Sequence, residues 1–148
     1  MDRAALDAAL ALGFPCGGWC PAGRIAEDGA IDQRYPLVET PGSEYGQRTE
    51  WNVRDADGTF IICRGELDGG TLYTRECARR LAKPYMVLDP DSPVCIDEVL
   101  SWICENSVRV LNVAGPRESK SPGIYLYARA IVEELIGALM APLFQATS

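Results

Sequence analysis

The sequence predicts an α/β domain of three layers, with a mostly parallel sheet between two layers of helices. Three apolar runs typical of buried strands, TFIIC, YMVLD and RVLNVAG, alternate with segments whose apolar residues recur at helical spacing. Strands that alternate with helices favour parallel pairing, because a crossover must join each strand to the next. A length of 148 residues suits one such domain, so we expect a single ligand-binding domain over residues 1–148.

The first helix is expected over residues 2–12, where Leu6, Ala9 and Leu10 share a face, and Gly13 ends it. In a doubly wound sheet such a helix normally follows a central strand and a glycine turn, and we expect this sheet to lack that strand. The polar stretch over residues 21–47 is rich in Pro and Gly. A connection of that length in a small domain is more often functional than idle.

The remaining elements follow from apolar patterning. The run at residues 59–63 predicts a strand buried on both faces, and the runs at 85–89 and 109–115 predict two more apolar strands. Helical spacing predicts four further helices, which are expected at residues 47–57 and 71–83, around Ile96, Val99, Leu100 and Ile103, and around Ile124, Ala128, Ile131, Leu135 and Leu139.

Composition argues against several classes of function. The chain has 14 Lys and Arg against 21 Asp and Glu, and a net charge of −7 does not suit a nucleic-acid surface. It has no histidine, which removes Ser-His-Asp triads and His-ligated metals within the chain. The longest apolar stretch, residues 123–144, contains Arg129, Glu133 and Glu134 and therefore predicts an amphipathic helix instead of a membrane span.

The six cysteines include no C-x-x-C pair, and no grouping completes a zinc site. Cys63 lies in an apolar strand and Cys77 on an apolar helix face. This placement favours buried thiols in a reducing cytoplasm, with disulfides or metal ligands as the alternative. No signal peptide is visible, so a cytoplasmic protein is expected.

Ligands of open parallel sheets bind beyond the carboxyl ends of the strands, and the loop after the first buried strand has suitable residues there. Gly69 and Gly70 allow close backbone approach, and Thr71 begins a helix whose free N–H groups favour an anion. Thr74 and Glu76 lie within the first turns. The alternative is a plain helix start with glycines for the turn.

A second candidate loop follows the third strand. Asn112 is suited to recognise a polar edge, Gly115 and Pro116 shape a tight turn, and Arg117 supplies charge for a phosphate or carboxylate. Ser119 is a candidate N-cap or phosphate donor. A capped helix with a solvated arginine is the alternative interpretation.

A third candidate precedes the first buried strand, where Arg48, Glu50 and Asn52 form a dense polar group that equally suits a solvated helix face. Trp51 between them suits either the core or a stacking surface. In GGWCPAGR, the glycines suggest backbone approach and Arg24 an anion contact, although a plain loop explains this segment as well.

Together these segments resemble a family of bacterial proteins known as putative molybdenum carriers, from Asp2 to about residue 137. The segments that carry the resemblance are DRAALDAALALGFPCGGWCPAGRIAEDG, YPLVETPGSEYGQRTEWNVRDADGTFII, GGTLYTRE and VLNVAGPRESKSPGIY. The resemblance implies a Rossmann-like fold, since the superfamily includes the Lonely Guy phosphoribohydrolases. It also implies a phosphorylated or nucleotide-like ligand, and the family name points to molybdenum cofactor, molybdopterin.

Lonely Guy enzymes carry a Pro-Gly-Gly loop with a catalytic Glu six residues after the second Gly. Gly69 and Gly70 match those glycines and Glu76 has the same spacing, but Asp68 replaces the Pro and Leu72–Tyr73 replaces a Gly-Thr pair. This departure weakens the hydrolase interpretation.

The resemblance also explains the expected loss of a strand. Family members place a strand and a Ser-Gly-Gly-Gln-Thr-Gly loop before a small apolar residue and Asp-Arg-Ala, and Met1 stands at that apolar position. Translation assigned to an internal GTG codon and a genuine truncation are the two explanations.

We therefore expect a cytoplasmic, non-enzymatic carrier in which the first two loops and Arg48 hold the phosphorylated ligand. The first alternative is a nucleotide phosphoribohydrolase that uses Glu76. The second alternative is a nucleotide sensor that acts through a partner protein. No metal site, nucleic acid or membrane is expected. The apolar last helix would suit a homo-oligomer.

Overall fold

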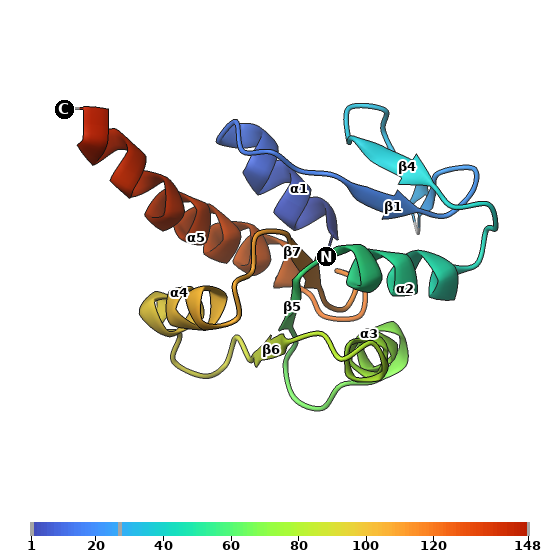
Figure 1. The fold of residues 1–148 in the computed structure, drawn as a ribbon. Coiled ribbons are helices and arrows are strands. Elements are labelled where there is room, and N and C mark those ends of the chain that lie inside the picture. Colours follow the sequence, from blue (N-terminus) through green and yellow to red (C-terminus); the bar gives the residue numbers. More distant parts are fainter. Residues whose placement is uncertain (1, 27, 148) are drawn as a thin grey trace.

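The computed structural model of this chain describes residues 2–26 and 28–147, and the side chains of all of these except residues 2 and 141–147; Met1 lies outside them. At the centre is β5, whose five residues are all buried. It pairs in parallel with β6 on one side and β7 on the other, which gives the order β6-β5-β7 (Figure 1). The Rossmann-like α/β fold with mostly parallel strands is confirmed.

Within the described residues the strands are β1 (Gly18–Cys20), β2 (Ile25–Ala26), β3 (Gly29–Ala30), β4 (Leu37–Glu39), β5 (Gly58–Ile62), β6 (Tyr85–Leu88) and β7 (Leu111–Ala114). The helices of the same residues are α1 (Asp2–Ala11), α2 (Tyr45–Asp55), α3 (Gly69–Arg80), α4 (Ile96–Glu105) and α5 (Ile124–Thr147). Each predicted helix and each of the three predicted strands is present, with ends that differ by a few residues.

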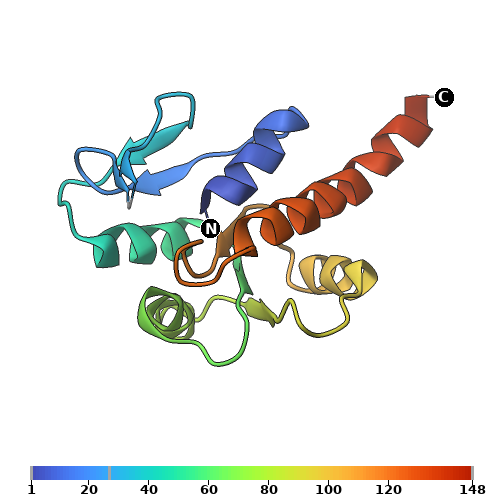
Figure 2. The ribbon, with the colours of Figure 1, turned by 180° about the vertical axis from the view of Figure 1, so that it is seen from behind.

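Helices cover both faces of the central sheet. Phe60 and Ile62 of β5 pack against α4 and α5 in the main hydrophobic core. On the opposite face, Val53 of α2 packs against Cys77 and Ala78 of α3. Helix α1 lies along α5, as both ribbon views show (Figures 1 and 2). None of the helices among the described residues has the length and apolar character needed to cross a bilayer.

The expectation that residues 85–89 form a buried strand was wrong. Strand β6 is only half-buried, with Val87 43% exposed, and β7 is half-buried over its first three residues. The reason is position, since each pairs only with β5 among the described residues and lies at an edge of the three-stranded sheet. Helix α3 also begins at Gly69, two residues earlier than expected, after Asp68 in an extended conformation.

The long polar stretch contains three strands that patterning did not predict, β2, β3 and β4. Strand β1, which lies in the segment FPCGGWC where a short extended piece is expected, pairs in parallel with β4, and β2 and β3 form a short antiparallel pair. We call residues 18–39 the β1–β4 unit. In Figure 1 it lies beside α1 and α2.

A buried arginine organises the β1–β4 unit. The Arg24 guanidinium is 8% exposed and donates hydrogen bonds of 2.8–3.2 Å to four backbone carbonyls, those of Ile31, Asp32, Tyr35 and Leu37. Of the two interpretations offered for this segment, the structure favours the plain loop over an anion contact at Arg24, because backbone carbonyls already accept four of its five guanidinium N–H groups.

All six cysteines are free thiols. Cys63 and Cys77 are buried as expected, and so is Cys20. Cys95 and Cys104 are exposed, which corrects the expectation of buried thiols: the first precedes α4 and the second lies in its last turn, away from the core face.

Candidate functional site

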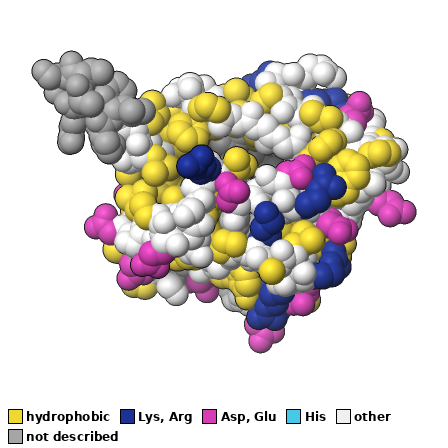
Figure 3. Space-filling view, in the orientation of Figure 1, with side chains coloured by type: hydrophobic (Ala, Val, Ile, Leu, Met, Phe, Trp, Pro, Cys, Tyr) yellow, Lys and Arg dark blue, Asp and Glu magenta, His cyan; other side chains and the backbone are white. Residues whose placement is uncertain are grey.

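A cavity of about 770 Å³ lies at the carboxyl ends of β5 and β7. Its walls come from α1, the β1–β4 unit, the first turns of α2 and α3, the loop after β7 and the start of α5. The volume is typical of sites for small molecules. In the space-filling view the face of Figure 1 is hollowed near its centre, with basic and acidic side chains around the hollow (Figure 3).

Most of the residues predicted from the sequence come together here. Those that line the cavity are Arg48, Asn52, Gly70, Thr71, Thr74, Asn112, Gly115, Pro116, Arg117 and Ser119. They belong to α2, α3, β7 and the loop after β7, so the three candidate segments form one site.

Three predicted residues do not line the cavity. Glu76 is half-exposed on α3, with ion pairs to Arg75 at 3.3 Å and Arg79 at 3.7 Å. Glu50 pairs with an arginine of α3 outside the cavity. Gly69 adopts a positive φ of 51° and so serves the turn into α3, a conformation that other residues rarely adopt.

One end of the cavity is suited to an anion. The first turn of α3 brings Gly70 and Thr71 to the wall, where backbone N–H groups at a helix start favour negative charge. The Thr74 hydroxyl donates to the Gly70 carbonyl at 2.9 Å. Beside this turn, Lys120 forms an ion pair of 2.5 Å with Asp68.

Two arginines converge on one aromatic ring at this end. The guanidinium carbon of Arg48 lies 5.8 Å from the centre of the Tyr45 ring, and that of Arg117 lies 5.4 Å from it. Arg48 comes from α2 and Arg117 from the loop after β7. Stacking on a shared ring holds two cations together beside the start of α3.

Trp19 is held rigidly in the part of the wall that comes from the β1–β4 unit. Its backbone N–H donates to the Asn52 side-chain oxygen at 2.8 Å, and the Asn52 amide donates back to the Trp19 carbonyl at 3.2 Å. The indole N–H donates to Asp55 at 2.7 Å, and the Trp51 ring packs edge-on with centres 4.7 Å apart. Asn52 therefore positions Trp19, and Trp51 serves as a packing surface.

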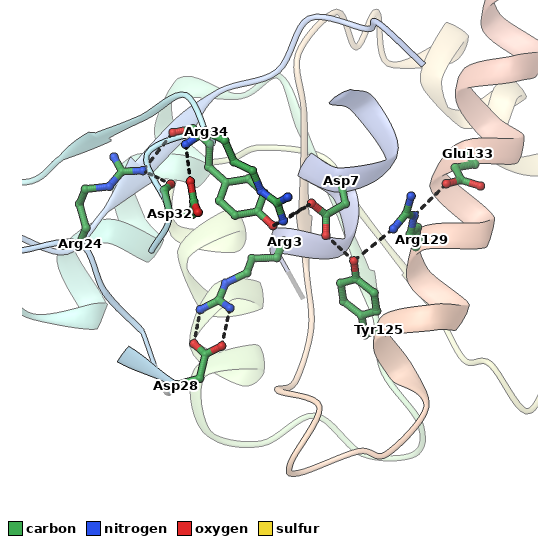
Figure 4. Close-up of polar contacts among 10 residues, drawn as sticks. Arg3, Asp7, Arg24, Asp28, Asp32, Arg34, Tyr125, Arg129 and Glu133 are labelled. Carbon is green, nitrogen blue, oxygen red and sulfur yellow. Dashed lines mark hydrogen bonds and ion pairs between the residues drawn. The ribbon is translucent and has the colours of Figure 1, made fainter. Parts of the chain in front are cut away.

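Polar contacts tie α1 to the β1–β4 unit and to α5 (Figure 4). Arg3 donates two hydrogen bonds to Asp28, at 2.7 and 2.5 Å, and lowers the pKa of that carboxyl to about 2. Asp7 accepts hydrogen bonds from the hydroxyls of Tyr35 and Tyr125. Burial and the bond to Asp7 raise the pKa of both tyrosines.

Comparisons with known proteins agree with this geometry. The sequence model of the circularly permutated YpsA SLOG family matches residues 1–136. This chain belongs to that family. It is also 43% identical to a protein of Syntrophus aciditrophicus SB whose crystal structure is described as that of a "putative molybdenum carrier protein". The two structures agree with a TM-score of 0.86 over 90% of this chain and 87% of the other.

The resemblance to the carrier family is thereby confirmed. Among curated proteins, none matches this chain. Within the described part of this family member, no three or more Cys, Asp or Glu side chains are grouped as they would be to hold a metal ion.

The link between Asn52 and Trp19 can be tested by substitution. Asn52→Ala removes both partners of the Trp19 backbone, and we expect it to lower the free energy of unfolding by about 1–2 kcal/mol in urea titrations. Asn106→Ala is the matched control, because Asn106 also donates to a tryptophan carbonyl but is exposed. It should cost less than about 0.5 kcal/mol. Equal losses in both variants would contradict the role of Asn52.

Proposed function

We propose that this protein is a carrier that binds a phosphorylated small molecule in the cavity at the carboxyl ends of β5 and β7. The cargo is the phosphorylated pterin of molybdenum cofactor or a nucleotide-like molecule. The chain acts as one domain in the cytoplasm and releases its cargo chemically unchanged.

One observation carries the proposal: Arg48, Arg117 and the first turn of α3 meet at one end of the cavity. Guanidinium groups bind phosphate oxygens through charged hydrogen bonds, and a helix start adds backbone donors. Asn112, whose amide lies 3.4 Å from the Thr59 hydroxyl, adds a polar group that orients the ligand. The name of the similar Syntrophus protein supports molybdenum cofactor as the cargo.

Arg117→Ala tests the anion site. We expect it to weaken binding of adenosine monophosphate and of a phosphorylated neopterin by about 10–100-fold in calorimetric titrations, because a charged hydrogen bond is lost. Arg109→Ala is the control, since it removes the same charge at the opposite end of β7. Unchanged affinity in Arg117→Ala would refute the site.

The hydrolase alternative has its own readout. Glu76 lies outside the cavity and is paired with arginines of its own helix, so we expect no free adenine from adenosine monophosphate. If adenine is released and this release disappears in Glu76→Gln, the protein is an enzyme and not a carrier.

Native mass spectrometry of protein purified from its own cells would identify the cargo directly. A bound pterin would support the carrier proposal.

A further inference from the structure

Part of the cavity wall is apolar. It contains Leu6 of α1 together with Trp19, Ile25, Ile31 and Leu37 of the β1–β4 unit, and we call these five residues the apolar wall. Ile25 is 47% exposed although it lines the cavity. An aliphatic wall of this kind gains free energy when a ligand covers it.

The charged groups near the apolar wall are paired with one another. Arg3 and Asp28 form a two-bond ion pair, and the Tyr125 hydroxyl donates to Asp7, so the Tyr125 ring is what remains for the cavity (Figure 4). The apolar wall therefore favours an uncharged, flat group, in contrast to the anion-binding groups Arg48 and Arg117.

Trp19 is also prepared for contact before a ligand arrives. Asn52 bonds its backbone, Asp55 bonds its indole N–H and Trp51 makes a T-shaped contact with its ring, so the ring loses little freedom on binding. A rigid aromatic side chain beside aliphatic residues is a typical surface for stacking a heterocycle.

We propose that the apolar wall binds the planar heterocycle of a ligand whose phosphate lies between Arg48, Arg117 and the start of α3. This inference rests on the proposed function and extends it, because it assigns the ring and the phosphate of one ligand to different residues of the cavity. Pterins and purines share the required chemistry, a flat neutral ring system linked to a phosphate.

The experiment compares ligands that differ only in the ring. Calorimetric titrations of the full chain use ribose phosphate, adenosine monophosphate and a phosphorylated neopterin. At least one of the two ring-bearing probes should bind about 10-fold or more tightly than ribose phosphate, because stacking and apolar burial are added. It should also change the tryptophan fluorescence, and this change should be lost in Trp19→Leu.

Matched variants place the ring. Ile25→Asn should reduce the preference for the ring-bearing probe by about 10-fold and change ribose phosphate affinity less than about 2-fold. Val38→Asn is the control, because Val38 is 58% exposed in the same unit but does not line the cavity, and it should change neither. Circular dichroism and urea titrations confirm that both variants fold.

The outcomes separate this inference from the proposed function. Ribose phosphate that binds as tightly as both ring-bearing probes would overturn the ring site and leave the phosphate site standing. Equal losses of ribose phosphate and ring-bearing probes in Ile25→Asn would also overturn it. Binding of none of the probes would refute both the proposed function and the inference. A preference for neopterin over adenosine identifies a pterin carrier, and the reverse identifies a nucleotide carrier; either supports the ring site.

Discussion

Arg24→Met should lower the free energy of unfolding by about 3–5 kcal/mol, which is a large part of the stability of a domain of this size. The substitution removes a charged donor from four carbonyls of residues 31–37, of which those of Asp32 and Tyr35 keep a backbone N–H partner. Hydrogen bonds from a charged donor contribute more than neutral ones, and unpaired buried carbonyls add a desolvation cost. The loss of free energy of unfolding should be smaller than the sum for four separate hydrogen bonds, because water can reach the carbonyls as the loop relaxes.

The measurement is a urea titration together with hydrogen exchange of the backbone amides of residues 31–37. Arg34→Met is the control within the same loop, since the Arg34 side chain is 64% exposed and contacts Tyr35 at the surface. We expect it to cost less than about 1 kcal/mol. The free energy of unfolding of Arg24→Met could instead equal that of the control, with unchanged hydrogen exchange of residues 31–37. That result would show that Arg24 does not organise the β1–β4 unit.

Arg24 also separates the part of the fold that the sequence predicts from the part that it does not. The central sheet was predictable because β5 is an unbroken run of mostly β-branched and aromatic residues, which is typical of a buried strand. Strands β2 and β3 have two residues each and no periodicity. They depend on hydrogen bonds from Arg24 to carbonyls 7–13 residues later, and nothing in a sequence separates a buried arginine from one that binds an anion.

The candidate site was predictable where a strand end fixes the location. Thr71 and Arg117 come after β5 and β7, and Asn112 lies within β7, so the strand-end rule places them at one edge of the sheet. Tyr125 and Asp7 meet across 118 positions, and Tyr45 reaches Arg117 only in the folded chain. No local pattern encodes such contacts.

Glu76 was predicted from motif spacing, but it lies outside the cavity. Its spacing from Gly70 matches a catalytic motif, but a helix turns about 100° per residue, which places Glu76 roughly 140° around α3 from Thr71. Thr71 and Thr74 lie on the cavity side, and Glu76 turns towards Arg75 and Arg79. Motif spacing therefore predicted a residue type at the right distance along the chain but not on the right face of the helix.

Arg48→Ala combined with Arg117→Ala should weaken binding of adenosine monophosphate or phosphorylated neopterin by about 100–1,000-fold. The two guanidinium groups lie 5.8 and 5.4 Å from the centre of one ring, so we expect them to hold the same phosphate. Two groups that hold one anion are coupled, because each contributes fully only while the other fixes its position. The loss in the double variant should therefore fall short of the sum of the single losses by at least about 0.5 kcal/mol.

The control pair removes the same charge from outside the cavity. Arg79→Ala combined with Arg109→Ala changes the net charge equally, and it should alter affinity less than about 2-fold at physiological salt because exposed charges beyond a Debye length are screened. Losses at Arg48 and Arg117 that add within about 0.3 kcal/mol would mean that the two arginines contact separate groups. A carrier in which both arginines hold one phosphate requires the coupling, because both guanidinium groups then contact the same anion.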